Sequence, residues 1–196
     1  RFIMKDLNEN FRFSRYENSF IWLKEAGVAL PVYCVQEPEL PLLLSKSTNL
    51  FKLFLSDVGL LASMYVDGLQ LKILSREKDI NFGAIYENVA AQELKAHGFE
   101  LYYFNSKKQG ELDFVIEYQK NVLPLEIKSG KAYTRHNALD NVLKDERYAI
   151  PQAFVFCNEN VSTQEKVTYL PIYMIGFLEK EKIEEYIYSI DLSVLQ

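Results

Sequence analysis

Two neighbouring strand-like runs with charge inside them constrain this chain more than any other feature. Residues 111–118 read Glu-Leu-Asp-Phe-Val-Ile-Glu-Tyr, and residues 122–128 read Val-Leu-Pro-Leu-Glu-Ile-Lys. Their apolar content and the short polar stretch between them predict two β-strands joined by a hairpin. Asp113, Glu126 and Lys128 lie inside these runs, where a charge is costly unless it has a partner. The runs therefore predict a sheet that carries a charged cluster.

The alternation of side chains predicts which residues of the hairpin share a face. Strict alternation puts Asp113 on one face of its strand and Leu112 and Phe114 on the other. A four-residue loop at 118–121 would set Asp113 opposite Glu126. A two-residue loop at 120–121 would set Asp113 opposite Lys128. Both registers bring Asp113, Glu126 and Lys128 together.

A fourth charged residue, Glu87, belongs to a helix predicted over about 81–97. Its neighbours one helical turn away are Gly83, Ala90 and Ala91. Small residues around a lone carboxylate leave room for an ion, a water or a phosphate. We therefore expect Glu87 at the edge of the buried face, where the helix meets the rim of the sheet.

Three carboxylates and an ammonium are groups that can hold a hard divalent cation and activate a water beside it. Asp113, Glu126 and the carbonyl of Ile127 are the predicted ligands of Mg²⁺ or Mn²⁺. Glu87 would hold a water-bound or second ion, and Lys128 would position the attacking water or help deprotonate it. The alternative is a cluster of ion pairs at a solvent-facing sheet surface. The spacing alone leaves both interpretations open.

The rest of the pattern predicts a mixed α/β fold with a central mixed sheet flanked by helices. The predicted helices are 17–26, 57–64, 81–97, 134–148 and 177–189, and the predicted strands are 28–35, 51–55, 99–104, 111–118, 122–128, 152–157 and 167–173. A polar connection at 68–79 predicts the boundary between a first segment, 1–68, and a second domain, 69–196. The helix and strand early in the first segment suggest part of a winged helix.

Composition limits the classes of function. The net charge of −5 argues against a generic nucleic-acid coat protein. It does not exclude a nuclease, because a bound metal ion supplies its own positive charge. Cys34 and Cys157 each lie in an apolar run without a metal-spaced partner, and we expect both to be reduced core residues of a cytoplasmic protein. No apolar stretch is long enough for a membrane span.

The basic residues that flank the predicted site allow two interpretations. They are Lys107, Lys108, Lys128, Lys131 and Arg135. They could form a local phosphate track, or they could be scattered surface lysines and arginine. His136 could reach a phosphate near the site, but a surface role is the stronger expectation.

Residues 82–131 resemble the PD-(D/E)XK nuclease superfamily, which has a helix Glu, a strand Asp and a following (D/E)-x-K. The matching residues are Glu87, Asp113, Glu126 and Lys128. The chain departs from that pattern where Glu111-Leu112-Asp113 replaces the Pro-Asp of the name. The resemblance implies a restriction-endonuclease-like fold and a catalytic role for these four residues.

The chain also resembles the DUF4143 family over about residues 17–178. The motifs that carry this resemblance are Phe51–Leu61, Gly83–Asn88 and Leu125–Gly130. The family's members are typically ATPases in which an AAA+-like P-loop domain precedes a winged-helix segment and a nuclease-like domain. The chain has no Gly-x-x-x-x-Gly-Lys-Ser/Thr motif and starts at Arg1, so the resemblance implies the C-terminal part of such an ATPase.

Two functions are therefore expected from the sequence. The first is a metal-dependent nuclease domain that acts on DNA. The second is a binding or regulatory module with a nuclease-like fold, which would recognise nucleic acid or a protein and couple that to the N-terminal ATPase domain.

Overall fold

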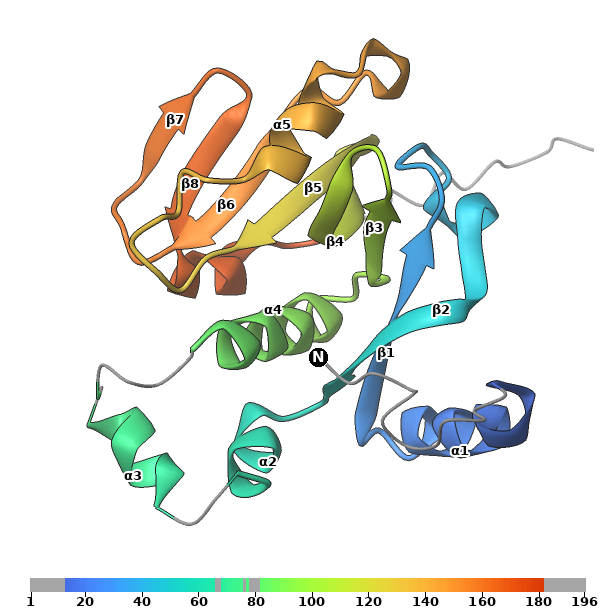
Figure 1. The fold of residues 1–196 in the computed structure, drawn as a ribbon, viewed down its shortest axis with the longest axis vertical. Coiled ribbons are helices and arrows are strands. Elements are labelled where there is room, and N and C mark those ends of the chain that lie inside the picture. Colours follow the sequence, from blue (N-terminus) through green and yellow to red (C-terminus); the bar gives the residue numbers. More distant parts are fainter. Residues whose placement is uncertain (1–12, 66–67, 76, 78–81, 182–196) are drawn as a thin grey trace, which may run out of the picture.

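A computed structural model describes residues 13–65, 68–75, 77 and 82–181. Within these residues the strands form one sheet in the order β2-β1-β3-β4-β5-β6-β8-β7 (Figure 1). The strands are β1 (Ala29–Val35), β2 (Lys46–Leu55), β3 (Tyr102–Ser106), β4 (Gly110–Tyr118), β5 (Asn121–Ile127), β6 (Ala153–Cys157), β7 (Ser162–Gln164) and β8 (Val167–Pro171). The α-helices are α1 (Phe13–Glu25), α2 (Val58–Ser63), α3 (Leu69–Leu74), α4 (Gly83–Ala96) and α5 (Asn137–Lys144). The 3₁₀ helices are η2 (Leu42–Ser45), η3 (Glu146–Tyr148) and η4 (Ile172–Phe177).

The expected mixed α/β architecture is confirmed, with some differences in its elements. α3 lies within the predicted polar connection. The sequence did not predict this helix, because six residues are too few to show a clear amphipathic period. The helix predicted over 134–148 is divided into α5 and η3. The helix predicted over 177–189 lies largely outside the described residues, and residues 178–181 are not helical.

The sheet is mixed because its connections differ in length. β3, β4 and β5 are antiparallel neighbours, whereas β5, β6 and β8 run parallel. The β4–β5 turn has only two residues, Gln119 and Lys120, with φ of 49° and 59°. Such left-handed turns match the twist of the strands they join. The turn is shorter than the predicted four-residue loop, but its register is the same, since Phe114 pairs with Leu125.

Two apolar cores lie on the two faces of the sheet. On one face, Ala90, Ala91 and Leu94 of α4 pack in a core that includes Phe114 and Leu125. On the other face, α5 contributes Leu139 and Val142 to a core that includes Leu112, Val115 and Val155. We call these the α4-side core and the α5-side core; β5 lies between α4 on one face of the sheet and α5 on the other (Figure 1).

The β1–β2 hairpin is joined to the same sheet, because β1 pairs in parallel with β3. The buried Asn88 of α4 adds a second link: its Oδ1 accepts from the Leu55 N–H at 2.9 Å and its Nδ2 donates to the Leu55 carbonyl at 3.0 Å. The sheet therefore continues across the predicted boundary near residue 68. The division into two domains and the winged-helix likeness of the first segment remain predictions.

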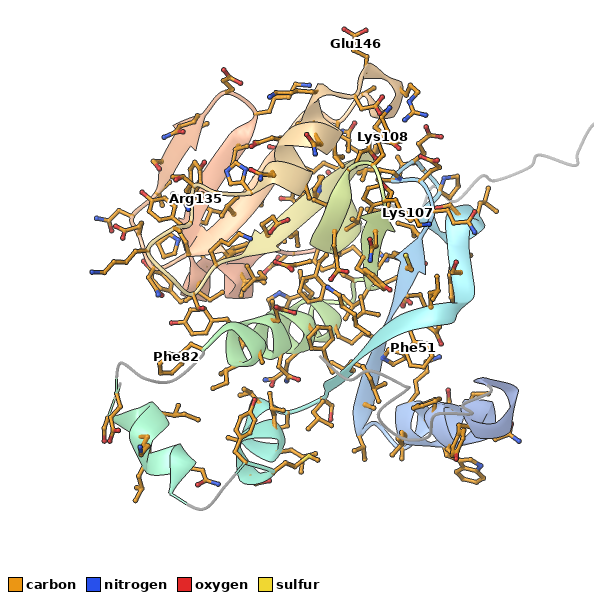
Figure 2. The ribbon with its side chains drawn as sticks, in the orientation of Figure 1. Phe51, Phe82, Lys107, Lys108, Arg135 and Glu146 are labelled. Carbon is orange, nitrogen blue, oxygen red and sulfur yellow. The ribbon has the colours of Figure 1, made fainter. Side chains whose placement is uncertain are left out.

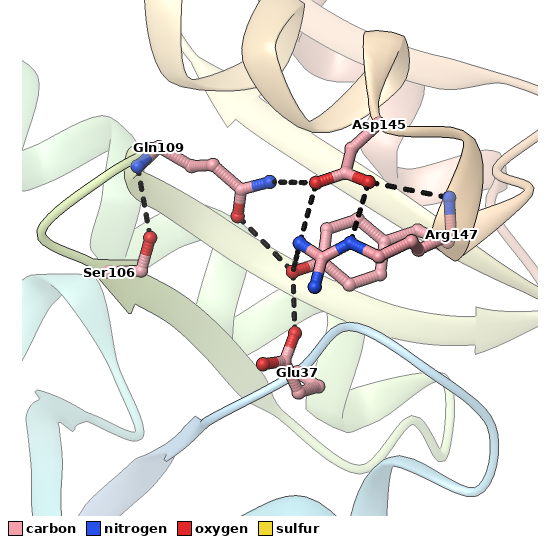
Figure 3. A network of polar contacts seen from close by, with 6 residues as sticks. Glu37, Ser106, Gln109, Asp145 and Arg147 are labelled. Carbon is pink, nitrogen blue, oxygen red and sulfur yellow. Dashed lines mark hydrogen bonds and ion pairs between the residues drawn. The ribbon is translucent and has the colours of Figure 1, made fainter.

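A polar network joins the loop after β1 to the β3–β4 turn and the end of α5 (Figure 3). Tyr148 Oη donates to Glu37, and Gln109 Nε2 donates to Asp145 Oδ2 at 2.8 Å. Arg147 binds Asp145 through two side-chain nitrogens, at 2.9 and 2.7 Å. This network is a further connection between the N-terminal hairpin and the rest of the sheet.

Replacing Asn88 tests the link between α4 and β2. Asn88→Ala removes both bonds and leaves the N–H and carbonyl of Leu55 without these partners. We expect the free energy of unfolding to fall by roughly 2–4 kcal/mol. Chemical denaturation measures the change. The control is Lys95→Ala, which removes only an exposed ion pair and should cost less than about 1 kcal/mol. Equal losses in both variants would contradict the link.

Candidate functional site

A β-bulge in β4 shapes the site. Tyr102 pairs with Val115 and Phe104 pairs with Leu112, so two steps along β3 correspond to three along β4. The extra residue falls at Asp113–Phe114, and a bulge of this kind re-aims the side chains around it. Leu112 consequently packs in the α5-side core and Phe114 in the α4-side core. The expectation that Leu112 and Phe114 share a face was wrong, because strict alternation fails at a bulge.

The bulge turns the Asp113 carboxylate toward β5. Its Oδ2 accepts a hydrogen bond from the backbone N–H of Ile127 at 2.8 Å. In a regular antiparallel ladder that N–H would face a backbone carbonyl of β4. The side chain of Asp113 therefore takes the place of a ladder bond and lies next to the end of β5.

Glu126 and Lys128 form an ion pair at this end of β5. Lys128 Nζ lies 2.7 Å from Glu126 Oε2, with 4% of the Glu126 side chain exposed and 28% of the Lys128 side chain. The backbone N–H of Lys128 donates to the Phe156 carbonyl of β6 at 2.8 Å. That bond extends the β5–β6 ladder and fixes the start of the Lys128 side chain. The structure thus brings Asp113, Glu126 and Lys128 together, as the sequence predicted.

The buried carboxylates of the cluster resist ionisation. Burial, aided by the negative charge of Asp113, raises the pKa of Glu126 to about 8, although Lys128 opposes the shift. Burial also raises the pKa of Glu87, and Asp113 adds to that rise. Both shifts favour the protonated form of these carboxyls, so a bound cation would compete with protons at the cluster.

Lys128 behaves in the opposite way. Burial lowers its pKa, but attraction to Glu126, Asp113 and Glu87 outweighs burial, so the pKa of Lys128 is raised overall. The side chain is an ammonium at neutral pH. It can stabilise negative charge and orient a water, and this state does not suit the removal of a proton from that water.

Glu87 lies on α4 and is partly buried. It is close to the cluster: its negative charge contributes to the raised pKa of Lys128, and the charge of Asp113 contributes to the raised pKa of Glu87 itself. Its small neighbours have a different role from the one expected. Ala90 and Ala91 are fully buried in the α4-side core, so their size lets the helix lie close to the sheet instead of leaving room for an ion.

The donor set suits a hard divalent cation in its chemistry, since Asp113 and Glu126 supply adjacent carboxylates. Among the described residues, however, no three His, Cys, Asp or Glu side chains are grouped so that they could hold a metal ion. A metal at this place would rely on Asp113, Glu126 and the Ile127 carbonyl, with Glu87 acting through a water. This ligand set remains a prediction.

The basic residues around the site come from different loops. Lys107 and Lys108 lie at the β3–β4 turn, and Arg135 lies apart from them in the loop before α5 (Figure 2), so a phosphate track remains a prediction. His136 is buried: its Nε2 lies 2.8 Å from Tyr169 Oη and its Nδ1 lies 2.9 Å from Asp140 Oδ1. The expected surface role of His136 was therefore wrong.

One charged residue near the cluster was missed by the reasoning from sequence. Lys52 of β2 is buried and its Nζ lies 2.9 Å from Glu111 Oε1. The sequence does show a lysine inside the apolar run 51–55. It does not show which carboxylate pairs with that lysine, because Lys52 and Glu111 are 59 positions apart (111 minus 52) and are brought together by the sheet.

Comparison with known families gives a match to part of the chain. Residues 82–175 match the family described as Domain of unknown function (DUF4143). This match supports the DUF4143 family for the chain. The DUF4143 match contains Glu87, Asp113, Glu126 and Lys128, and it begins after β2. No curated protein and no solved structure matches the chain. None of the helices in the described part has the length and apolar character needed to cross a bilayer.

The raised pKa of Glu126 predicts a pH-dependent stability. A carboxyl with a higher pKa in the folded than in the unfolded chain stabilises the fold below its ordinary value of 4.5, and this stability is lost as pH rises through about 8. Glu126→Gln removes the titration. We expect urea unfolding in EDTA to show that the variant loses less stability than the wild type between pH 5 and pH 8.5, by up to a few kcal/mol.

The control for that comparison is Glu146→Gln, the same chemical change at an exposed residue far from the cluster (Figure 2). It should keep the wild-type pH dependence. Parallel curves for the wild type and Glu126→Gln would show that Glu126 has no raised pKa.

Proposed function

We propose that the cluster is the site of a metal-dependent phosphodiesterase that cuts DNA. The observation that carries the proposal is the position of Asp113, in a bulge, beside the buried ion pair of Glu126 and Lys128. The resemblance to PD-(D/E)XK nucleases supports it. In that pattern a helix supplies a Glu and strands supply an Asp and a (D/E)-x-K, and here α4, β4 and β5 carry these residues.

The charge balance of the cluster also supports a divalent cation. The carboxylates of Glu87, Glu111, Asp113 and Glu126 face the ammonium groups of Lys52 and Lys128. At full ionisation four negative and two positive charges leave an excess of two negative charges. One divalent cation would neutralise this excess and compete with the proton that the raised pKa of Glu126 favours.

Each residue of the cluster has a role in this proposal. Asp113, Glu126 and the Ile127 carbonyl would hold Mg²⁺ or Mn²⁺, which would supply Lewis acidity and an activated water. The ammonium of Lys128 would offset the negative charge that develops on the phosphate. Glu87 would accept a hydrogen bond from a water between α4 and the sheet. We also propose, from the family resemblance, that an N-terminal AAA+-like ATPase domain acts with this site.

A cleavage assay tests the proposal. The wild-type chain is incubated with Mg²⁺ or Mn²⁺ on plasmid, single-stranded and branched DNA. Asp113→Asn and Lys128→Met should each lower the cleavage rate by at least about 100-fold, because each removes a group needed at the reacting phosphate. The control, Glu146→Gln, should cut at the wild-type rate. Wild-type cleavage no faster than that of Asp113→Asn would exclude catalysis at this site.

A second function, a binding or regulatory module, has its own support. The net charge of −5 and the lack of a strong basic stripe in the sequence favour a fold without catalysis. Such a module would bind nucleic acid or a protein and couple that binding to the ATPase domain. DNA binding that depends on salt but is unchanged by Asp113→Asn would support it.

The separation of the basic residues predicts which of them DNA contacts. Lys131 and Arg135 are exposed and follow Lys128 in the chain, whereas Lys107 and Lys108 lie at the β3–β4 turn. Replacing both Lys131 and Arg135 by Met should weaken DNA binding and reduce the slope of its salt dependence by about two. The matched control replaces Lys107 and Lys108 and should leave the slope nearly unchanged. The reverse result would place DNA at the β3–β4 turn.

A further inference from the structure

Lys52 is a buried lysine on a strand at the edge of the sheet. Only 6% of its surface is exposed. It pairs in register with Val32, a residue of the α4-side core, so its side chain starts on the face that α4 covers. The ammonium lies 2.9 Å from Glu111 Oε1 and 4.9 Å from the centre of the Tyr103 ring.

Burying this ammonium has a cost that an apolar residue would avoid. The effective penalty for taking a charge out of water is several kcal/mol, and an ion pair often does no more than compensate it. The position pairs with the buried Val32 of the α4-side core, beside which a leucine or methionine would suit. The stability of the hairpin therefore does not explain a lysine at this position. The contacts that the ammonium makes offer another explanation.

Those contacts fix Glu111. Its Oε1 binds Lys52, and its Oε2 accepts from Asn105 Nδ2 at 2.8 Å. Glu111 is level with Asn105 on β3, directly before the bulge that carries Asp113. Both carboxylate oxygens of Glu111 are thus bound, one to a residue of β2 and one to a residue of β3, directly before the bulge in β4.

We propose that Lys52 is a positioning residue of the candidate phosphodiesterase site: by holding Glu111 it fixes the bulged part of β4, and so the place of Asp113 next to Ile127 and Glu126. This inference rests on the proposed function. It extends the site beyond the matched region 82–175, because Lys52 comes from the N-terminal hairpin. The attraction of Lys52 for Glu87 agrees with an ammonium close to the cluster.

The test compares variants of Lys52 in the full chain. Lys52→Met removes the ammonium, Lys52→Arg retains a cation, and Lys52→Met with Glu111→Gln removes the pair without leaving a buried charge. Lys95→Met is the matched control, because its ion pair with Glu100 has the same 2.9 Å separation but is exposed. Circular dichroism first establishes which variants are folded.

We expect Lys52→Met and the double variant to lower kcat for Mn²⁺-dependent DNA cleavage by about 10-fold to 100-fold, since a small displacement of a reacting group has an effect of this size. KM for DNA should stay within about twofold, because a buried side chain does not contact the substrate. Lys52→Arg should recover most of the rate, and Lys95→Met should match the wild type. Wild-type kcat in the folded double variant, or an equal loss in Lys52→Arg, overturns the proposal.

A second readout is independent of cleavage. The backbone amide of Ile127 donates to Asp113, so its ¹H and ¹⁵N chemical shifts report the place of that carboxylate. This signal should move in Lys52→Met and return in Lys52→Arg, and Lys95→Met should leave it in place. If the wild type cuts no DNA, the proposed function fails, and this signal alone decides the positioning role. An unmoved signal in Lys52→Met overturns it.

Discussion

The extra residue in β4 is the constraint on which the site depends. Without it, β4 would alternate regularly beside β3, and Asp113 would be one more side chain on a sheet face. With it, the Asp113 carboxylate binds the Ile127 N–H and lies beside the buried Glu126. Burial and the charge of Asp113 oppose the ionisation of Glu126, so a proton, a lysine or a cation stabilises the site. Lys128 supplies one positive charge at this point.

The fold holds the two sides of this cluster from different parts of the chain. β5 carries Glu126 between two cores and Lys128 follows directly after it, whereas Glu87 lies on α4, which packs on one face. The β1–β2 hairpin is bound through Asn88, through the network at Glu37 and through the Lys52–Glu111 pair. A description limited to residues 82–175 would omit all three contacts, because Leu55, Glu37 and Lys52 lie outside that range.

Sequence reasoning predicted what depends on local order. The hairpin and the meeting of Asp113, Glu126 and Lys128 follow from apolar alternation and a short turn, because both registers that the sequence allowed bring these residues together. The bulge could not be predicted, because one extra residue leaves the run 111–118 looking like a regular strand. The partner of Lys52 and the burial of His136 were missed for another reason: both depend on strands and helices that are distant in sequence.

The most direct test of the account is a crystal structure of the chain soaked in Mn²⁺, with data collected for anomalous scattering. The account predicts an anomalous peak between the Asp113 and Glu126 carboxylates, within coordination distance of both and of the Ile127 carbonyl, with the Lys128 ammonium nearby. An Asp113→Asn crystal treated in the same way should lose the peak. Well-ordered wild-type carboxylates without a peak between them, at millimolar Mn²⁺, would contradict the central claim.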